Sequence, residues 1–382
     1  MTSTTGWRQD WIRTLFRCVA RFIRALPNRC GGKKQLPAVS GCFAVLLGFL
    51  LQSASASDAG VKCRPLISGN LWWITPDMMK GGMSKWRDEL DDQQKIGFDL
   101  LWLCNTASVI DLPGDPLRQL LDLCQKRKVK VVLDAGTSGP WWEPLVLAKE
   151  LSICTNHIKA IGGHYGGHPA FYAWYLSQEI YMCWGGEADY INHLYPELVK
   201  QCKQSANLPV MVSPFFILDR QKIFGDFRFN DPDEYRDYWK GLLKRSGIDI
   251  VLLQDSGEHF SYVTIEQRQP FFEAMAQACQ QSGAKLWGNV EVAEMLCDSP
   301  DEYARKYGRV HPSKASGLPW RAVPMDRLKE KLDLAAQYSD RIVSWGYQEY
   351  CRPQLSPVAA KWYQDYSVYY TSGRAKTRIE HK

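Results

Sequence analysis

The sequence predicts an α/β protein built around a single closed (β/α)8 barrel, also called a TIM barrel. Past residue 60, short apolar segments alternate eight times with longer segments of helical period. Crossovers of helical length make successive strands parallel. A barrel of eight such units takes about 250 residues plus insertions, which suits residues 63–370. The alternative, an open doubly wound sheet, usually carries GxGxxG after its first strand, and this sequence has none there.

Each predicted strand is a short apolar run rich in β-branched or aromatic residues. The eight strands are expected at 66–75, 98–104, 129–136, 171–180, 209–216, 248–256, 284–292 and 341–350. The eight helices are expected at 83–97, 115–128, 144–161, 189–205, 231–247, 264–283, 324–340 and 356–370. Asp115 stands before Pro116 and is expected to cap its helix. No linker divides residues 63–370, which are predicted to form one domain followed by a polar tail, 371–382.

Residues 1–56 form a basic leader with eight Lys and Arg residues and one acidic residue. An apolar core at 43–51 is followed by Ala54-Ser55-Ala56, which fits the small-x-small rule for signal-peptide cleavage. We therefore expect an exported protein, periplasmic or secreted. The alternative is an uncleaved membrane anchor over residues 36–51, although that core is short for spanning a bilayer. The basic amphipathic segment before it is also suited to lying on a membrane surface.

Charge and cysteine content exclude several classes of function. Outside the leader remain 39 of the 47 basic and 40 of the 41 acidic residues, a net charge of −1. This balance lacks the excess of positive charge that is typical of a nucleic-acid-binding protein. The 12 cysteines include no CxxC pair and no Cys/His spacing typical of zinc, so we expect neither a metal nor a cofactor. Most cysteines are expected as buried thiols, with one or two bridges at most.

Two glutamates are the candidate catalytic residues. Active sites of such barrels lie at the C-terminal ends of the strands. Side chains alternate along a strand, so Glu179 shares a face with Tyr175, and Glu291 shares a face with Asn289. If those faces point inward, two carboxyls from nearly opposite strands meet above the barrel core. Glycosidic-bond hydrolysis needs such a pair, one protonated and one that attacks or activates water. Taken singly, each glutamate is as readily explained as a solvated rim residue or a helix cap.

Other polar residues at strand ends are expected to support this pair. Asp134 and Asp255 are candidates for binding sugar hydroxyls or orienting the glutamates, and Gln178 and Asn289 for binding hydroxyls through their amides. Glu294 competes with Glu291 for the role at strand seven.

The chain contains 15 tryptophans, and their flat apolar faces suit the C–H faces of sugar rings. The tryptophans expected to bind substrate are those at strand ends, namely Trp72, Trp73, Trp141, Trp142 and Trp345. Trp184 also follows a strand, whereas Trp102, Trp174 and Trp287 lie within strands and are expected to fill the core.

Three phrases carry a family resemblance: "GGHPAFYAWYLSQEI", "LWGNVEV" and "SWGYQEYCRP". Residues 63–370 resemble the (β/α)8 glycoside hydrolases with catalytic glutamates after strands four and seven. More narrowly, they resemble an uncharacterised bacterial family of glycosidase-like barrels, domain of unknown function 4434. The resemblance implies Glu179 as general acid/base, Glu291 as nucleophile and retention of anomeric configuration. The chain departs from the superfamily at Gln178, where an asparagine usually precedes the acid/base.

Three hypotheses for function remain open. The first is an exported glycoside hydrolase acting on an oligosaccharide or polysaccharide. The second is a non-catalytic glycan-binding barrel serving a cell-envelope polysaccharide export system, which burial of one glutamate in a salt bridge would favour. The third is another barrel enzyme, such as a metal-dependent hydrolase or a phosphosugar enzyme. Against the third, no His-x-His follows strand one and no phosphate-binding glycine pair follows strands seven and eight.

Overall fold

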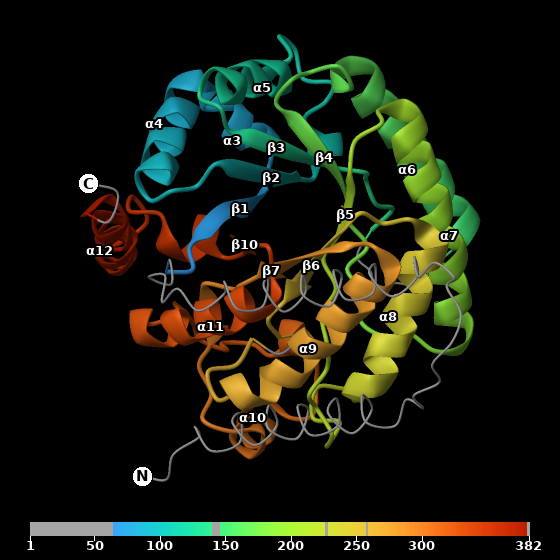
Figure 1. Cartoon of the computed structure of the whole chain (residues 1–382), viewed down its shortest axis with the longest axis vertical. Helices are drawn as coiled ribbons and strands as arrows, with labels where there is room; N and C mark the ends of the chain where they lie inside the picture. The colour runs from blue at the N-terminus through green and yellow to red at the C-terminus, as the bar shows by residue number, and fades with distance from the viewer. Residues whose placement is uncertain (1–63, 140–145, 226–227, 257–258, 380–382) are drawn as a thin grey trace, which may run out of the picture. The chain divides into compact units, whose positions relative to one another are not determined.

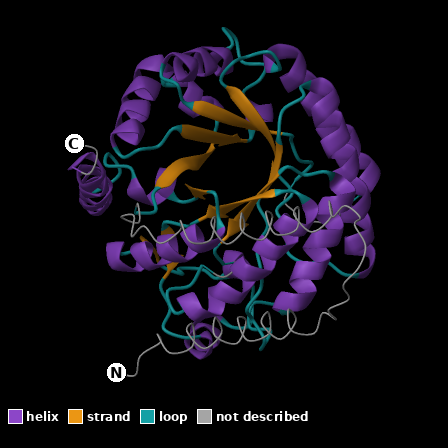
Figure 2. Ribbon diagram, in the orientation of Figure 1, coloured by secondary structure: helices purple, strands orange, loops and turns teal. Residues whose placement is uncertain are grey.

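The computed structural model describes residues 64–139, 146–225, 228–256 and 259–379. It confirms a closed barrel of eight parallel strands in the order β1-β10-β7-β6-β5-β4-β3-β2 (Figures 1 and 2). The barrel strands are β1 (Ile67–Trp73), β2 (Leu100–Cys104), β3 (Lys130–Asp134), β4 (Phe171–Leu176), β5 (Val210–Val212), β6 (Ile250–Gln254), β7 (Lys285–Asn289) and β10 (Arg341–Ser344). Each lies within a predicted strand.

Helices form a ring outside the barrel, as Figure 2 shows. They are α3 (Pro76–Lys80), α4 (Gly82–Lys95), α5 (Pro116–Lys126), α6 (Leu147–Tyr165), α7 (Gly185–Ser205), α8 (Pro232–Ser246), α9 (Ile265–Ser282), α10 (Pro300–Tyr307), α11 (Met325–Tyr338) and α12 (Pro357–Ile379). The last helix therefore continues into the segment 371–382. In the described part of the chain, no helix is both long enough and apolar enough to cross a bilayer. The leader, 1–56, lies outside the described residues.

The barrel interior is filled by side chains from alternate strand positions. This inner core comprises Leu71, Leu100, Trp102, Cys104, Val132, Ala173, Tyr175, Met211, Ile250, Leu252, Trp287 and Val343. Trp102 meets Tyr175 edge to face, with ring centroids 4.5 Å apart. Because inward positions recur every second residue, the inward set of β4 includes Tyr175 and that of β7 includes Trp287. The predicted inward faces of both strands are confirmed.

The intervening strand residues point outward and pack against the helices. Leu101, Val131 and Trp174 are fully buried in this second layer. Trp174 also donates its indole N–H to the carbonyl of Ala206, 3.0 Å away. Burial on both faces explains why the strands read as continuous apolar runs. All eight cysteines in the described ranges are buried and unpaired, so no disulfide contributes to this part of the fold.

Several helices begin at a residue whose side chain caps the first turn. The carboxylate of Asp115 accepts a hydrogen bond from the backbone N–H of Arg118 at 3.0 Å, as predicted. Asp231 caps α8 in the same way, accepting from the N–H of Asp233 at 3.0 Å. Thr264 and Gln267 form a complete capping box at the start of α9. Each cap sets the direction in which a helix leaves the strand-end loop before it.

The structure departs from the predicted pattern after β7. Residues 293–323, called the β8–β9 insertion below, contain an antiparallel pair, β8 (Ala293–Met295) and β9 (Trp320–Ala322), with α10 between them. The insertion has a small hydrophobic core of its own with Ile223, Phe224, Phe260, Val263, Met295, Cys297 and Tyr303. Strands of three residues leave too short a pattern to recognise in a sequence, so this element was not predicted.

We expect Trp102→Ala to lower the free energy of unfolding of the full chain by about 3–5 kcal/mol, because it empties a fully buried site in the inner core. The matched change Trp73→Ala removes a side chain that is 51% exposed, and is expected to cost less than about 0.5 kcal/mol. Urea denaturation followed by circular dichroism measures both. Equal losses would contradict a packed barrel interior.

Candidate active site

Glu179 stands three residues beyond the end of β4, on the inward-facing side. Its carboxylate accepts hydrogen bonds from the Tyr175 hydroxyl at 2.8 Å and from the Gln254 amide at 3.1 Å. The residue is partly buried. Burial raises the pKa of Glu179, while the two hydrogen bonds and the nearby charge of His259 oppose that rise. A carboxyl with a raised pKa that remains open to solvent suits proton donation.

Glu291 follows β7 and is 2% exposed. One of its oxygens contacts Nδ1 of His259, which lies in the loop after β6. Burial raises the pKa of Glu291, and the charge and hydrogen bond of His259 oppose the rise. Burial also acts to lower the pKa of His259, yet the Glu291 carboxylate outweighs it and the pKa of His259 is raised. Both pKa values are therefore raised, so the pair holds its protons to a higher pH than the two groups would in water.

Glu179 and Glu291 follow β4 and β7, so both lie at the C-terminal end of the barrel. The charge of His259 lowers the pKa of each, against the rise that burial causes. A hydrogen-bond chain also links their strands: the amide of Gln254 reaches the carbonyl of Ser213 at 3.2 Å, and the amide of Asn289 reaches the Ser213 hydroxyl at 3.1 Å. The other amide atom of Asn289, Oδ1, is buried without a hydrogen-bond partner in the described structure and offers an acceptor to a hydroxyl.

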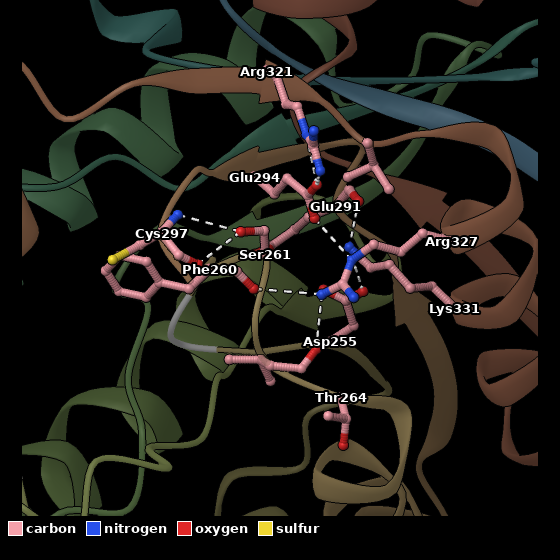
Figure 3. A network of polar contacts seen from close by, with 12 residues as sticks. Asp255, Phe260, Ser261, Thr264, Glu291, Glu294, Cys297, Arg321, Arg327 and Lys331 are labelled. Carbon is pink, nitrogen blue, oxygen red and sulfur yellow. Dashed lines mark hydrogen bonds and ion pairs between the residues drawn. The ribbon is translucent and has the colours of Figure 1, made fainter. Parts of the chain in front are cut away.

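A buried ion pair lies directly behind Glu291. Nζ of Lys331 on α11 is 2.8 Å from Oδ2 of Asp255, and both side chains are 3% exposed or less. The same ammonium donates to the backbone carbonyl of Glu291 at 2.6 Å. Figure 3 shows Lys331 reaching from the outer helix toward Asp255 and Glu291. Asp255 is thereby paired with Lys331, and its predicted role of binding sugar hydroxyls or orienting the glutamates stays a prediction.

The carboxylate of Glu294 is paired with two arginines, and in this it differs from Glu291. Arg321 donates to Oε1 of Glu294 from Nε at 2.9 Å and from Nη2 at 2.7 Å. Nε of Arg327 lies 2.8 Å from Oε2. Figure 3 shows Glu294 turned toward Arg321 of the β8–β9 insertion and Arg327 of α11. One oxygen of Glu294 therefore pairs with Arg321 of the insertion and the other with Arg327 of α11, whereas Glu291 contacts His259.

Two predicted substrate-binding residues turn away from the opening. The amide of Gln178 donates to the carbonyl of Gly136 at 3.2 Å and also to Glu150 of α6, so it packs between β4 and the helix layer. Asp134 accepts from the backbone N–H groups of Asn105, at 3.2 Å, and Thr106, at 3.1 Å. Gln178 thus joins a strand to a helix, and Asp134 caps the turn after β2. Neither placement supports sugar binding.

The tryptophans predicted to bind substrate differ in their exposure to solvent. Trp72 is 2% exposed and packs on Trp86, with ring centroids 5.4 Å apart, so it belongs to the core. Trp73 is 51% exposed. Trp345 is partly exposed and lies next to His259, with ring centroids 5.6 Å apart. Trp141 and Trp142 lie outside the described residues. Trp73 and Trp345 therefore remain as accessible candidates.

Sequence reasoning missed His259 and Lys331, which contact Glu291, and Trp320, whose ring centroid lies 5.8 Å from that of His259. His259 follows strand six by five residues, so its place at a strand end was a usable signal. Lys331 lies in an ordinary amphipathic helix, and Trp320 lies in the unrecognised insertion. Their roles depend on contacts between segments far apart in the chain, for which a single sequence has no signal.

The described residues enclose a cavity of about 370 Å³, but neither glutamate lines it. It lies between the loop after β5 and the start of α9, with Phe224, Tyr262 and Phe271 among its walls. Within the described ranges, no group of three or more His, Cys, Asp or Glu residues is placed to hold a metal ion. The place of Glu179 after β4 and of Glu291 after β7, and not a cavity, therefore defines the candidate site.

A closed parallel barrel with two glutamates above its C-terminal end defines a class, the glycosidase-like (β/α)8 barrels. The sequence model of one family, described as "Domain of unknown function (DUF4434)", matches residues 48–361, and the chain belongs to this family. No curated protein matches the sequence.

Solved structures support the same fold. The chain is similar to a candidate alpha-L-fucosidase from Bacteroides thetaiotaomicron VPI-5482, with a TM-score of 0.62 and 19% identity over 90% of this chain and 99% of the other. It is also similar to an endo-beta-1,4-mannanase from Thermotoga petrophila, with a TM-score of 0.46 and 13% identity over 82% of this chain and 78% of the other. The likeness to the first of these, at 19% identity, shows the fold alone.

We expect Tyr175→Phe to raise the pKa of Glu179 above its value in the unchanged protein, because the lost hydrogen bond favours the charged carboxylate. Carbon-13 NMR titration of labelled glutamate carboxyls measures the change. The matched control is Tyr195→Phe, which removes a hydroxyl bonded to the carbonyl of Gln178 and leaves the Glu179 carboxylate with both donors. A shift of equal size in the control would contradict this assignment.

We expect Lys331→Met to destabilise the fold by about 3–5 kcal/mol, because it leaves the Asp255 carboxylate buried and unpaired. The double variant Asp255→Asn with Lys331→Met is expected to recover most of that loss. The comparison pair is Glu89 and Arg352, a second ion pair of 2.8 Å with a buried carboxylate. Chemical denaturation measures all variants, and a double variant no more stable than Lys331→Met alone would refute the pairing.

Proposed function

We propose that this protein is an exported glycoside hydrolase that cleaves an oligosaccharide or polysaccharide with retention of configuration. The observation that carries the proposal is the pairing of a solvent-accessible glutamate of raised pKa, Glu179, with a second carboxylate, Glu291, at one end of a closed barrel. Export, to the periplasm or beyond, rests on the basic leader and its cleavage-like sequence alone. Association with a membrane through the same leader is part of the proposal.

In this mechanism Glu179 supplies the proton that the leaving oxygen needs. Tyr175 and Gln254 each hold one carboxyl oxygen, which orients the group, and burial keeps the proton on it to a higher pH than in water. When the glycosidic bond breaks, Glu179 becomes a carboxylate. It then takes a proton from the water that releases the sugar, and the group returns to its starting state.

Glu291 is the nucleophile in the same mechanism and must attack as a carboxylate. The positive charge of His259 favours that form, and Lys331 holds the backbone of Glu291 in place. Attack on the anomeric carbon forms an ester and removes the negative charge of Glu291. His259 then loses the partner that raises its pKa, so its preference for the charged state is greatest before attack and after the ester is hydrolysed.

One observation favours a second candidate, a glycan-binding barrel without catalysis in a cell-envelope polysaccharide export system. The Glu291 side chain is 3% exposed and already engaged by His259, as a structural ion pair would be. In the catalytic mechanism His259 must release the Glu291 oxygen that it contacts when substrate enters. In the binding function the pair stays intact and only the accessible aromatic rings meet the glycan.

We expect Glu179→Gln and Glu291→Gln each to reduce turnover by about 10²–10⁴-fold, since each removes a group that acts on the reacting atoms. Digestion of a glycan panel, analysed by mass spectrometry, identifies the substrate and measures the loss. The matched control is Glu349→Gln, an exposed glutamate after β10, which is expected to keep full activity.

Unchanged turnover in both glutamate variants would refute the hydrolase. Glycan binding on an array without turnover by the unchanged protein would instead support the binding barrel.

A further inference from the structure

We infer that the β8–β9 insertion is a substrate-recognition element, and that its Trp320 forms with Trp345 a subsite for a second sugar unit. The inference rests on the proposed function, because it takes Glu291 as the group that meets the sugar at the scissile bond. The ligand class is a saccharide of two or more units that presents an apolar C–H face to an aromatic ring. The subsite goes beyond the strand-end tryptophans that the sequence predicts.

The aromatic rings beside Glu291 form one contiguous group. The centroid of the Trp320 ring lies 5.8 Å from that of His259 and 5.9 Å from that of Trp345. Tyr350 stacks on Trp320 at 5.9 Å with an interplanar angle of 22°. Trp320, Trp345 and Tyr350 are all partly exposed, so the group borders solvent and is accessible to a ligand. An accessible aromatic group next to a carboxylate is suited to binding sugar rings.

The backbone of the insertion determines where these rings lie. Met295 of β8 pairs with Trp320 of β9 and also bonds to the segment of His259: its N–H donates to the His259 carbonyl at 2.7 Å, and its carbonyl accepts from the Ser261 N–H at 2.9 Å. The Val292 N–H donates to the carbonyl of Trp345 at 3.0 Å. Main-chain bonds of Met295 in the insertion, and of Val292 just before it, therefore align His259, Trp320 and Trp345.

The opposite face of the β8–β9 pair is attached to helix α11 through an ion cluster. Glu294 and Arg321 form a cross-strand pair, and Arg327 of α11 completes the ion cluster seen in Figure 3. Because side chains alternate along each strand, the residues next to this pair, Met295 and Trp320, point to the other face. Met295 is buried in the small core, and Trp320 packs against the same core. The ring of Trp320 is thus held in a fixed position.

His259 lies next to both the aromatic group and the candidate nucleophile. Its imidazole contacts Glu291 and also lies against the Trp320 ring. Trp320 and Glu291 therefore both adjoin the imidazole of His259, so a sugar stacked on Trp320 is a neighbour of the sugar that Glu291 reaches. The structure thus favours a chain substrate over a single sugar with a small leaving group.

The test compares kcat/KM for 4-nitrophenyl glycosides of a monosaccharide and of the matching trisaccharide, in the glucose, mannose and xylose series. We expect Trp320→Leu to lower kcat/KM for the trisaccharide about tenfold or more, and to leave the monosaccharide within about twofold. Trp320→Phe keeps a flat ring and is expected to restore much of the loss. Equal losses on both substrates, or none on the trisaccharide, would overturn the subsite.

The matched control is Tyr307→Leu, which makes the same kind of change in α10, where the ring contacts Tyr303 at 5.3 Å. It is expected to leave both rate constants unchanged. A loss of trisaccharide preference in this control equal to that of Trp320→Leu would show that the insertion has been disordered and would overturn the assignment to Trp320.

Binding measurements separate failure of the subsite from failure of the proposed function. If the unchanged protein binds trisaccharides on a glycan array without hydrolysing them, the hydrolase is wrong, and weaker binding by Trp320→Leu still supports the subsite. If it hydrolyses glycans and Trp320→Leu does so equally well, the hydrolase stands and the subsite is wrong. If the unchanged protein neither binds nor hydrolyses any glycan, both are wrong.

Discussion

Closure of a parallel sheet is the constraint on which the rest of this structure depends. When eight parallel strands close, their C-terminal ends meet at one rim, and every second residue points toward the axis. Tyr175 and Trp287 fill the axis, and the chain beyond each of their strands brings Glu179 and Glu291 to the same rim. The site is thus a consequence of strand parity and closure, with loops supplying what differs from one such barrel to another.

Burial of charge is the second constraint. Glu291, Asp255 and Glu294 are each at most 2% exposed, and a carboxylate in such surroundings is stable only with a charged or hydrogen-bonding partner. His259, Lys331 and the two arginines at Glu294 provide those partners. Glu179 differs from these three carboxylates, because it accepts its hydrogen bonds from the neutral donors Tyr175 and Gln254 and it keeps part of its surface exposed.

Both constraints apply to the β8–β9 insertion. It carries the glutamate and arginine that compensate each other's charge, and on its other face it holds an aromatic ring beside the catalytic candidates. A three-residue strand pair is a weak element on its own. Its small core, the main-chain bonds to the His259 segment and the arginine from α11 supply the stability that the short strands lack. Recognition and structural support are therefore located in one segment.

The sequence by itself determined the barrel, the positions of its eight strands, the inward faces of β4 and β7, and the cap at Asp115, because period and capping are local properties of the chain. Only the tertiary structure decided which residues the side chains of the candidate site contact. Adjacent residues differ in outcome: Trp72 is buried and Trp73 exposed, while Gln178 turns to the helices and Glu179 to the opening. Glu294 was separated from Glu291 only by arginines about 30 residues away in the chain. Long-range contacts of this kind, like that of Lys331 with Asp255, depend on how folded segments are placed in space, and no spacing within one sequence encodes them.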